Sequence, residues 1–133
     1  MTRTSLDDFA CSWARTAEII GDKWTIMILR DMFGGVQSFS DFKKRLGIAG
    51  NVLTDRLNQL CAQGIVEKRP IREGVERFDY VLTPRGRELF PIFVAMMQWG
   101  DKWLFGVEGE PIRMIDRQNG APMQPMLVTA MDG

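Results

Sequence analysis

The sequence of 133 residues contains no histidine and only two cysteines, Cys11 and Cys61. Without histidine the chain cannot form a Ser-His-Asp or Cys-His catalytic group, or a metal site with imidazole ligands. Two cysteines far apart in the sequence are too few for a disulfide framework or a cysteine-based zinc site. Gly34-Gly35 also lacks the Lys-Ser/Thr that follows a phosphate-binding glycine loop. We therefore expect no metal, no cofactor and no enzymatic activity.

The sequence also lacks any apolar run close to the about 20 residues that a membrane-spanning helix needs. Residues 1–9 contain no apolar signal core and become acidic early. A hydrophobic content of 45% and a charged content of 26% are typical of one globular domain. These features predict a cytoplasmic protein with no membrane partner.

The formal net charge is zero, which by itself argues mildly against a nucleic-acid partner. The charges are unevenly distributed along the chain, however. Between Ser40 and Phe90 there are ten Lys/Arg and seven Asp/Glu, whereas the rest of the chain has seven and ten. The middle of the chain is therefore basic and its ends are acidic.

Apolar residues at helical spacing predict four helices in the first half of the chain. The first follows a capping-box pattern that opens with Ser5, and it ends near Ile20. The other three are expected over residues 23–33, 40–46 and 50–63. Asp22 and Ser40 are the expected caps of the second and third helices. Residues 36–39, just before Ser40, are compatible with a short strand.

The next part of the chain changes from helical to strand periodicity. Residues 65–71 and 77–83 flank the loop 72–76 and predict a β-hairpin. The helices 40–46 and 50–63, joined by a glycine-containing turn, have helix-turn-helix spacing. A hairpin directly after them makes a winged helix, whose second helix enters the major groove while the hairpin reaches the flanking backbone or the minor groove.

The polar face of the 50–63 helix is short and nearly uncharged. Asn pairs with adenine, and Thr hydrogen-bonds bases or touches the thymine methyl, so Asn51 and Thr54 suit base recognition. Asp55 accepts from cytosine N4 but is repelled by phosphates, so it is either tightly oriented or faces away. Basic residues before this helix and on the hairpin would hold the phosphates. The candidate DNA-binding residues are Ser40, Lys43, Lys44, Gly50, Asn51, Thr54, Asp55, Asn58, Arg72 and Arg77.

Thr83-Pro84 predicts the start of a last helix that runs to about Phe105. This helix is apolar on more sides than the arc of about 100° that packs on one core. The surplus predicts a partner, most simply a second copy of the chain. In residues 107–133, Asn119-Gly120 indicates a turn. This pattern is compatible with a small hairpin and also with a disordered tail. We therefore expect one domain over residues 1–106 and a separate tail.

A dense series of segments resembles the HxlR family of bacterial transcription regulators, in order and spacing, over about residues 9–105. The segments are Cys11 with Ala14-Arg15, residues 19–32, Phe39-Ser40 with Phe42, and residues 52–60, 64–69 and 80–89. The resemblance implies a mainly α winged helix-turn-helix that dimerises through its N- and C-terminal helices on a roughly palindromic operator. The candidate dimer-interface residues are Phe9, Trp13, Ile92, Met96, Trp99 and Trp103. The family favours a small hydroxyl where this chain has Ala49-Gly50, which implies a missing helix cap.

Cys11 is similar to the N-terminal cysteine of the family, which senses electrophiles or oxidants in several members. Such sensing requires an exposed thiol with a lowered pKa. Arg15, one helical turn away, favours it, and Asp7 and Asp8 oppose it. The alternative is a small buried residue near the dimer interface, and Cys61 is expected to be structural.

These features together predict a sequence-specific regulator that binds double-stranded DNA as a homodimer. A repressor is favoured over an activator, because blocking a promoter needs only tight binding. One alternative is a regulator that responds to a small molecule bound among Trp13, Trp24, Trp99 and Trp103, between the dimer helices, although such residues are often simply core. The other is a winged-helix module that binds proteins instead of DNA.

Overall fold

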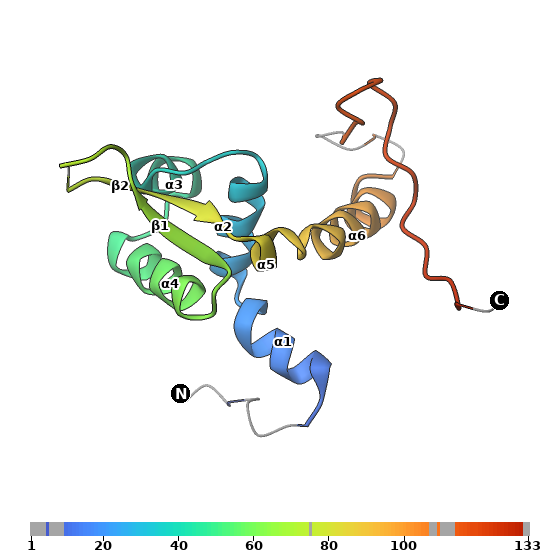
Figure 1. Ribbon diagram of the computed structural model, residues 1–133. Helices are drawn as coiled ribbons and strands as arrows, with labels where there is room; N and C mark the ends of the chain where they lie inside the picture. Colours follow the sequence, from blue (N-terminus) through green and yellow to red (C-terminus); the bar gives the residue numbers. More distant parts are fainter. Residues whose placement is uncertain (1–4, 6–9, 75, 107–108, 110–113, 132–133) are drawn as a thin grey trace. The chain divides into compact units, whose positions relative to one another are not determined.

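The structure, a computed structural model, describes residues 5, 10–74, 76–106, 109 and 114–131. The chain divides into two compact units, Met1–Glu88 and Leu89–Gly133 (Figure 1). The elements of the first unit are α1 Ser12–Ile20, α2 Lys23–Phe33, α3 Phe39–Leu46, α4 Gly50–Ala62, β1 Val66–Pro70, β2 Phe78–Leu82 and α5 Pro84–Arg87. Those of the second are α6 Phe90–Gly100 and the π-helical turn η1 Asp101–Phe105.

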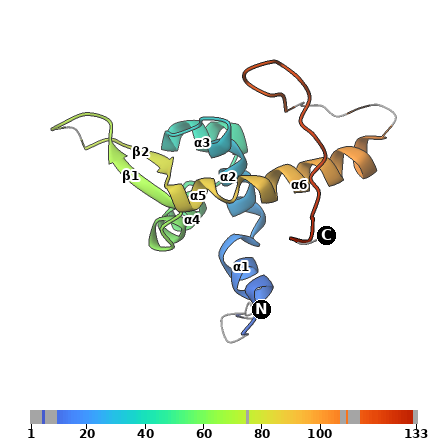
Figure 2. The ribbon, with the colours of Figure 1, turned by 45° about the vertical axis from the view of Figure 1, so that its right-hand side comes forward.

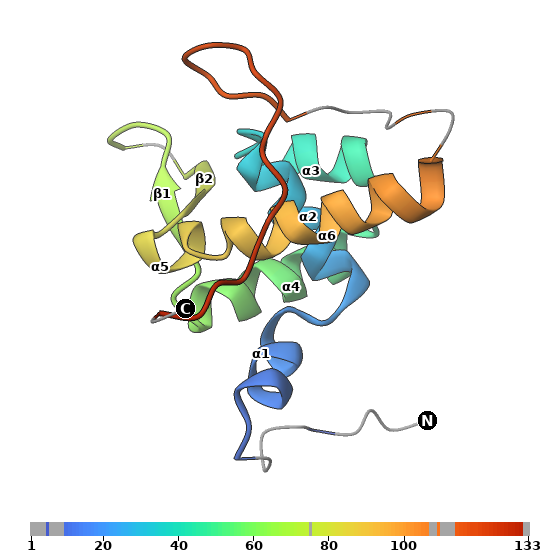
Figure 3. The same cartoon turned by 90° about the vertical axis from the view of Figure 1, so that its right-hand side faces the viewer.

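Helices α2, α3 and α4 enclose the core of the first unit. Figure 3 shows α3 on one side of α2 and α4 on the other. Leu53, Leu57 and Leu60 recur at helical spacing and are almost fully buried, so they fix one face of α4 inward. Burying each such side chain stabilises the fold by about 2 kcal/mol. The opposite face of α4 is thereby held towards solvent.

The hairpin predicted after α4 is confirmed. Strands β1 and β2 pair antiparallel, with Lys68 opposite Tyr80 and Pro70 opposite Phe78 in the last pair. The hairpin projects from the helices (Figure 2). The possible strand at residues 36–39 is reduced to one bridge between Ser38 and Asp79.

Two helix starts differ from the prediction. Helix α1 begins only at Ser12, because Cys11 has extended backbone and its carbonyl accepts from Arg15 N at 3.0 Å. Helix α3 is capped by Ser38 and not by Ser40. The Ser38 hydroxyl accepts from Asp41 N at 3.1 Å, and its backbone is extended, as a cap requires. Ser40 therefore lies within the first turn of α3.

The last helix was predicted to be continuous to Phe105, and this is wrong. Its start at Thr83 is confirmed, since the Thr83 hydroxyl accepts from Gly86 N at 3.0 Å. The helix then stops after Arg87 and resumes at Phe90. Pro91 has no N–H to donate to the carbonyl of Arg87, and in a continuous helix its ring would clash with that carbonyl, so the helix breaks.

The second unit continues from α6 into an extended tail. Asn119-Gly120 forms a tight turn, in which Gly120 N donates to Asp116 O at 2.8 Å and Gly120 has a φ of 71°. One bridge joins Ile115 to Pro122 beside this turn. Among the described residues, no helix is long and apolar enough to cross a membrane.

Candidate nucleic-acid interface

Helices α3 and α4 meet at a turn with a defined geometry. Gly47 follows α3 with a φ of 61°, a left-handed conformation that favours glycine, and its N–H closes onto Lys43 O at 3.0 Å. Ile48, buried in the turn, ties it to the core. The turn therefore fixes the direction in which α4 leaves α3.

The structure brings the predicted base-reading residues together on one surface. Asn51, Thr54, Asp55 and Asn58 are all exposed on α4, opposite its buried leucines. They cover three successive turns of the helix. The exposed face of α4 is thus polar along most of its length.

The first turn of α4 has no side-chain cap, as the sequence Ala49-Gly50 implied. The Lys43 ammonium lies 3.8 Å from the point where a Cβ on Gly50 would stand. Open N–H groups at a helix start attract anions, and a nearby cation strengthens this attraction. The start of α4 is therefore suited to a phosphate. The position of Lys43 was not predictable from the sequence, because it depends on the angle between the two helices.

The other cations of α3 and of the hairpin fall into two groups. Lys44, Arg72 and Arg77 are exposed, as is the hydroxyl residue Ser40. Within the described part of the chain, none of these three cations has an ion-pair partner. Arg45 instead donates to the buried Asp31 carboxylate through Nε and Nη2, both at 3.3 Å. Arg45 therefore ties α3 to α2.

The hairpin has one feature that the sequence analysis missed. The Lys68 ammonium lies 4.6 Å from the centre of the Phe78 ring and 6.0 Å from that of Tyr80. Cations are attracted to the faces of aromatic rings. The alternation of residues along β1 and β2 puts these side chains on one face, which was the available signal.

A group of ionic contacts behind α4 was also missed. Arg56 donates from Nε to Asp22 Oδ2 at 2.8 Å and from Nη1 to Asp55 Oδ2 at 2.6 Å. The hydrogen bond from Arg56, together with the N–H groups of Trp24 and Thr25, holds the pKa of Asp22 below its usual value. The same contact raises the pKa of Arg56. Asp22 was predicted only as the cap of α2, and this role is confirmed.

The two cysteines have different environments. Cys11 is exposed and lines a hollow of about 440 Å³ with Arg15 and Arg85. Cys61 is partly buried, and burial raises the pKa of its thiol. The Cys11 thiol is thus exposed to solvent near two arginines. Cys61 is expected to be the less reactive of the two cysteines.

Most of the candidate dimer-interface residues are exposed to solvent. Trp13 on α1 is 88% exposed, and Trp99 and Trp103 are 62% and 65% exposed. Ile92 and Met96 are also exposed on α6, whereas Phe9 lies outside the described residues. Exposed apolar patches of this kind mark interaction surfaces.

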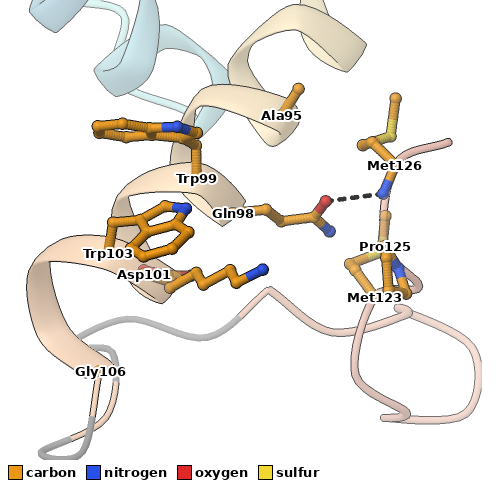
Figure 4. A pocket seen from close by; sticks show the side chains of 10 residues that line it. Ala95, Gln98, Trp99, Asp101, Trp103, Gly106, Met123, Pro125 and Met126 are labelled. Atoms are coloured by element: carbon orange, nitrogen blue, oxygen red, sulfur yellow. Dashed lines mark hydrogen bonds between the residues drawn. The ribbon is translucent and has the colours of Figure 1, made fainter. Parts of the chain in front are cut away.

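The second unit also holds a hollow of about 840 Å³ beside α6 (Figure 4). Gln98 spans it to the tail: its Nε2 donates to Gln124 O at 2.9 Å and its Oε1 accepts from Met126 N at 2.8 Å. Trp99 and Trp103 line this hollow, whereas Trp13 and Trp24 belong to the first unit. Its volume is in the range of small-molecule sites. No group of metal-binding side chains occurs among the residues that the structure describes.

The sequence profile of the HxlR-like helix-turn-helix family matches residues 19–107. The chain belongs to this family. Its relatives include the HTH-type transcriptional regulator Rv3095 of Mycobacterium tuberculosis, 38% identical over 117 residues, which are 88% of this chain and 74% of that protein. The chain is thus a member of a family of DNA-binding transcription regulators, as predicted.

Solved structures agree with this assignment. The crystal structure of PA1607, described as a candidate transcription factor, superposes with a TM-score of 0.89 at 38% identity over 98% of this chain and 91% of that one. The redox regulator HypR in its reduced form superposes with a TM-score of 0.64 at 31% identity over 69% of this chain and 92% of that one. The predicted winged helix-turn-helix fold is confirmed.

Proposed function

We propose that the protein is a repressor that binds a roughly palindromic operator in double-stranded DNA as a homodimer. Residues 1–106 carry DNA binding and dimerisation in this proposal, and residues 107–133 form a C-terminal tail. Since the chromosome is its target, the protein works in the cytoplasm. Repression requires only that the bound dimer block the promoter.

The observation that carries this proposal is the division of side chains around α4. Its exposed face is uncharged apart from Asp55, and this charge is matched by Arg56 at 2.6 Å. Cations that have no ion-pair partner among the described residues lie before it on α3 and after it on the hairpin. Base contacts give specificity and phosphate contacts give affinity, so Asn51, Thr54 and Asn58 read bases while Lys43 and its neighbours hold the backbone.

Dimerisation is supported by the apolar surface of the terminal helices. Trp13 and the exposed residues of α6 would cost free energy if they stayed in water. A two-fold dimer covers the same patch on both copies. It also presents two copies of α4 to two half-sites, which makes the operator palindromic.

Replacing Asn51 and Thr54 together by alanine is expected to relax the sequence preference. Each lost base contact costs about 1–3 kcal/mol of discrimination, while the phosphate contacts remain. The measurement compares gel shifts on a selected operator and on random duplex. Gln63→Ala, at the far end of α4, is the control and should keep the preference. An unchanged preference in the double variant would count against α4 as the reading helix.

A second proposal concerns regulation, and it is supported by the exposed thiol of Cys11 and the likeness to a protein named as a redox regulator. Two Cys11 thiols, one from each copy, join in a disulfide. The two electrons and two protons pass to the oxidant. The new bond changes the spacing of the two α4 helices and so weakens operator binding.

Diamide is therefore expected to lower the operator affinity of the wild type about tenfold, the scale of typical coupling between two sites. The Cys11→Ser variant should not respond, and Cys61→Ser should respond like the wild type. The measurement is a gel shift with diamide and then with dithiothreitol, alongside a non-reducing gel. Equal responses of the wild type and Cys11→Ser would contradict this regulation.

A further inference from the structure

Asp55 is an acidic residue on the exposed face of α4, the face that contacts DNA in the proposed function. An unmatched carboxylate there would be repelled by the phosphates. Arg56 prevents this, because its Nη1 donates to Asp55 Oδ2 at 2.6 Å. The side chain of Arg56 is only 21% exposed, whereas that of Asp55 is 54% exposed. The positive charge thus lies behind the carboxylate and leaves its front open.

Arg56 is itself held from the other side by Asp22. Its Nε donates to Asp22 Oδ2 at 2.8 Å and its Nη2 approaches Asp22 Oδ1 at 3.4 Å. Asp22 cannot move freely, since its Oδ2 also accepts the N–H groups of Trp24 and Thr25 at 3.1 Å. A continuous set of contacts therefore runs from the fixed start of α2 to the exposed face of α4.

Gln59, one turn further along α4, also helps to orient the Asp55 carboxylate. Its Nε2 donates to Asp55 Oδ2 at 3.0 Å. Oδ2 thus receives two donors, from Arg56 and from Gln59. Within the part of the chain that the structure describes, neither Asp55 Oδ1 nor Gln59 Oε1 receives a hydrogen bond. Two neighbouring acceptors are therefore available on the exposed surface.

We infer that Asp55 Oδ1 and Gln59 Oε1 share the one hydrogen that an exocyclic amino group of a base exposes in the major groove, and that Asp22 positions them through Arg56. The inference rests on the proposed binding of α4 to operator DNA. In the major groove, cytosine offers the N4 amino group and adenine the N6 amino group. Guanine and thymine offer the acceptors O6 and O4. Neither Asp55 Oδ1 nor Gln59 Oε1 carries a proton that it could donate to guanine O6 or thymine O4, so these two acceptors favour cytosine or adenine over guanine or thymine.

The test is a selection of bound fragments from random duplexes, followed by affinity measurements with each base at every operator position. The wild type should require cytosine or adenine on one strand at one position of each half-site. Asp55→Asn, which turns an acceptor into a possible donor, should accept guanine or thymine there, with discrimination about tenfold lower. Preference at the other positions should stay as in the wild type.

Asp22→Asn tests the positioning role, because asparagine still caps α2 but no longer carries the charge that holds Arg56. It should reduce discrimination at the same position and at no other, although Asp22 does not lie on the exposed face of α4. Arg56→Lys should act in the same way, since lysine keeps the charge but loses the forked geometry. Asp41→Asn on α3 removes the same charge outside this network, so it is the matched control and should leave discrimination unchanged.

The possible failures are distinguishable. If the wild type selects no sequence, the proposed function fails and this inference fails with it. If the wild type has a defined operator but Asp55→Asn selects the same base at every position, only the reading role is overturned. If Asp22→Asn and Arg56→Lys lower discrimination equally at all positions, with thermal unfolding unchanged, the positioning role is overturned.

Discussion

Replacing Gly86 by alanine is expected to lower the free energy of unfolding of the first unit by about 3 kcal/mol, at the upper end of overpacking effects. A Cβ on Gly86 would stand 2.2 Å from the carbonyl oxygen of Ile65 and 3.1 Å from Cδ2 of Leu82. The first distance is far inside van der Waals contact, so some part of the structure must shift.

The Ile65 carbonyl has little freedom to move. It accepts from Thr83 N at 3.0 Å and from the Thr83 hydroxyl at 3.2 Å. The same hydroxyl shares its single hydrogen with Gly64 O, at 2.6 Å, and accepts from Gly86 N to cap α5. Moving α5 away from Ile65 would therefore break several hydrogen bonds at once. Glycine is needed here for the close approach of two backbone segments.

The measurement is urea unfolding followed by circular dichroism. Gly100→Ala is the matched control, because a Cβ there would meet only Leu104 Cδ1 at 3.8 Å. Gly100 ends α6, where alanine favours the helix by up to about 1 kcal/mol. Gly86→Ala is thus expected to lower the free energy of unfolding, whereas Gly100→Ala is expected to raise it. If Gly86→Ala is as stable as the wild type, the close approach of Gly86 to the Ile65 carbonyl is not required for the position of α5.

The order of the helices and the hairpin could be predicted because each depends on nearby residues. Leu53, Leu57 and Leu60 define the inner face of α4 by spacing alone, and Asp22 was identifiable as a cap. The break before Phe90 was also readable, since Pro91 cannot continue a helix that began at Thr83. The apolar pattern, however, runs through Pro91 without interruption and favours one continuous helix.

Other features could not be predicted because they depend on contacts between distant residues. Ser38 and Ser40 carry the same side chain, and it is Ser38, which also forms a bridge with the distant Asp79, that has the extended backbone of a cap. Asp22 and Arg56 are 34 residues apart, so no local pattern joins them. The candidate DNA-binding surface was therefore predictable residue by residue, whereas the contacts that orient it were not.

Replacing Lys43, Lys44 and Arg77 together by alanine is expected to weaken DNA binding several hundred-fold per half-site at about 0.1 M salt, because each protomer of the proposed dimer loses three phosphate contacts. Each contact contributes about 0.9 to the slope of log affinity against log salt, which is about eightfold at this concentration. The slope itself should fall by nearly three per protomer, and thus by more than five for the proposed dimer, measured by fluorescence anisotropy over a salt series. The three side chains are exposed and have no acidic partner within the described residues, unlike Arg45 and Arg69.

The loss should be the same on the operator and on random duplex, because the base-reading residues of α4 are untouched. The control replaces Arg15, Lys102 and Arg117 by alanine, which removes the same charge outside the helix-turn-helix and the hairpin. If that control lowers the slope equally, overall charge and not the position of the cations governs binding. If instead the first triple variant loses its preference for the operator, the division between base reading on α4 and phosphate contacts around it is wrong.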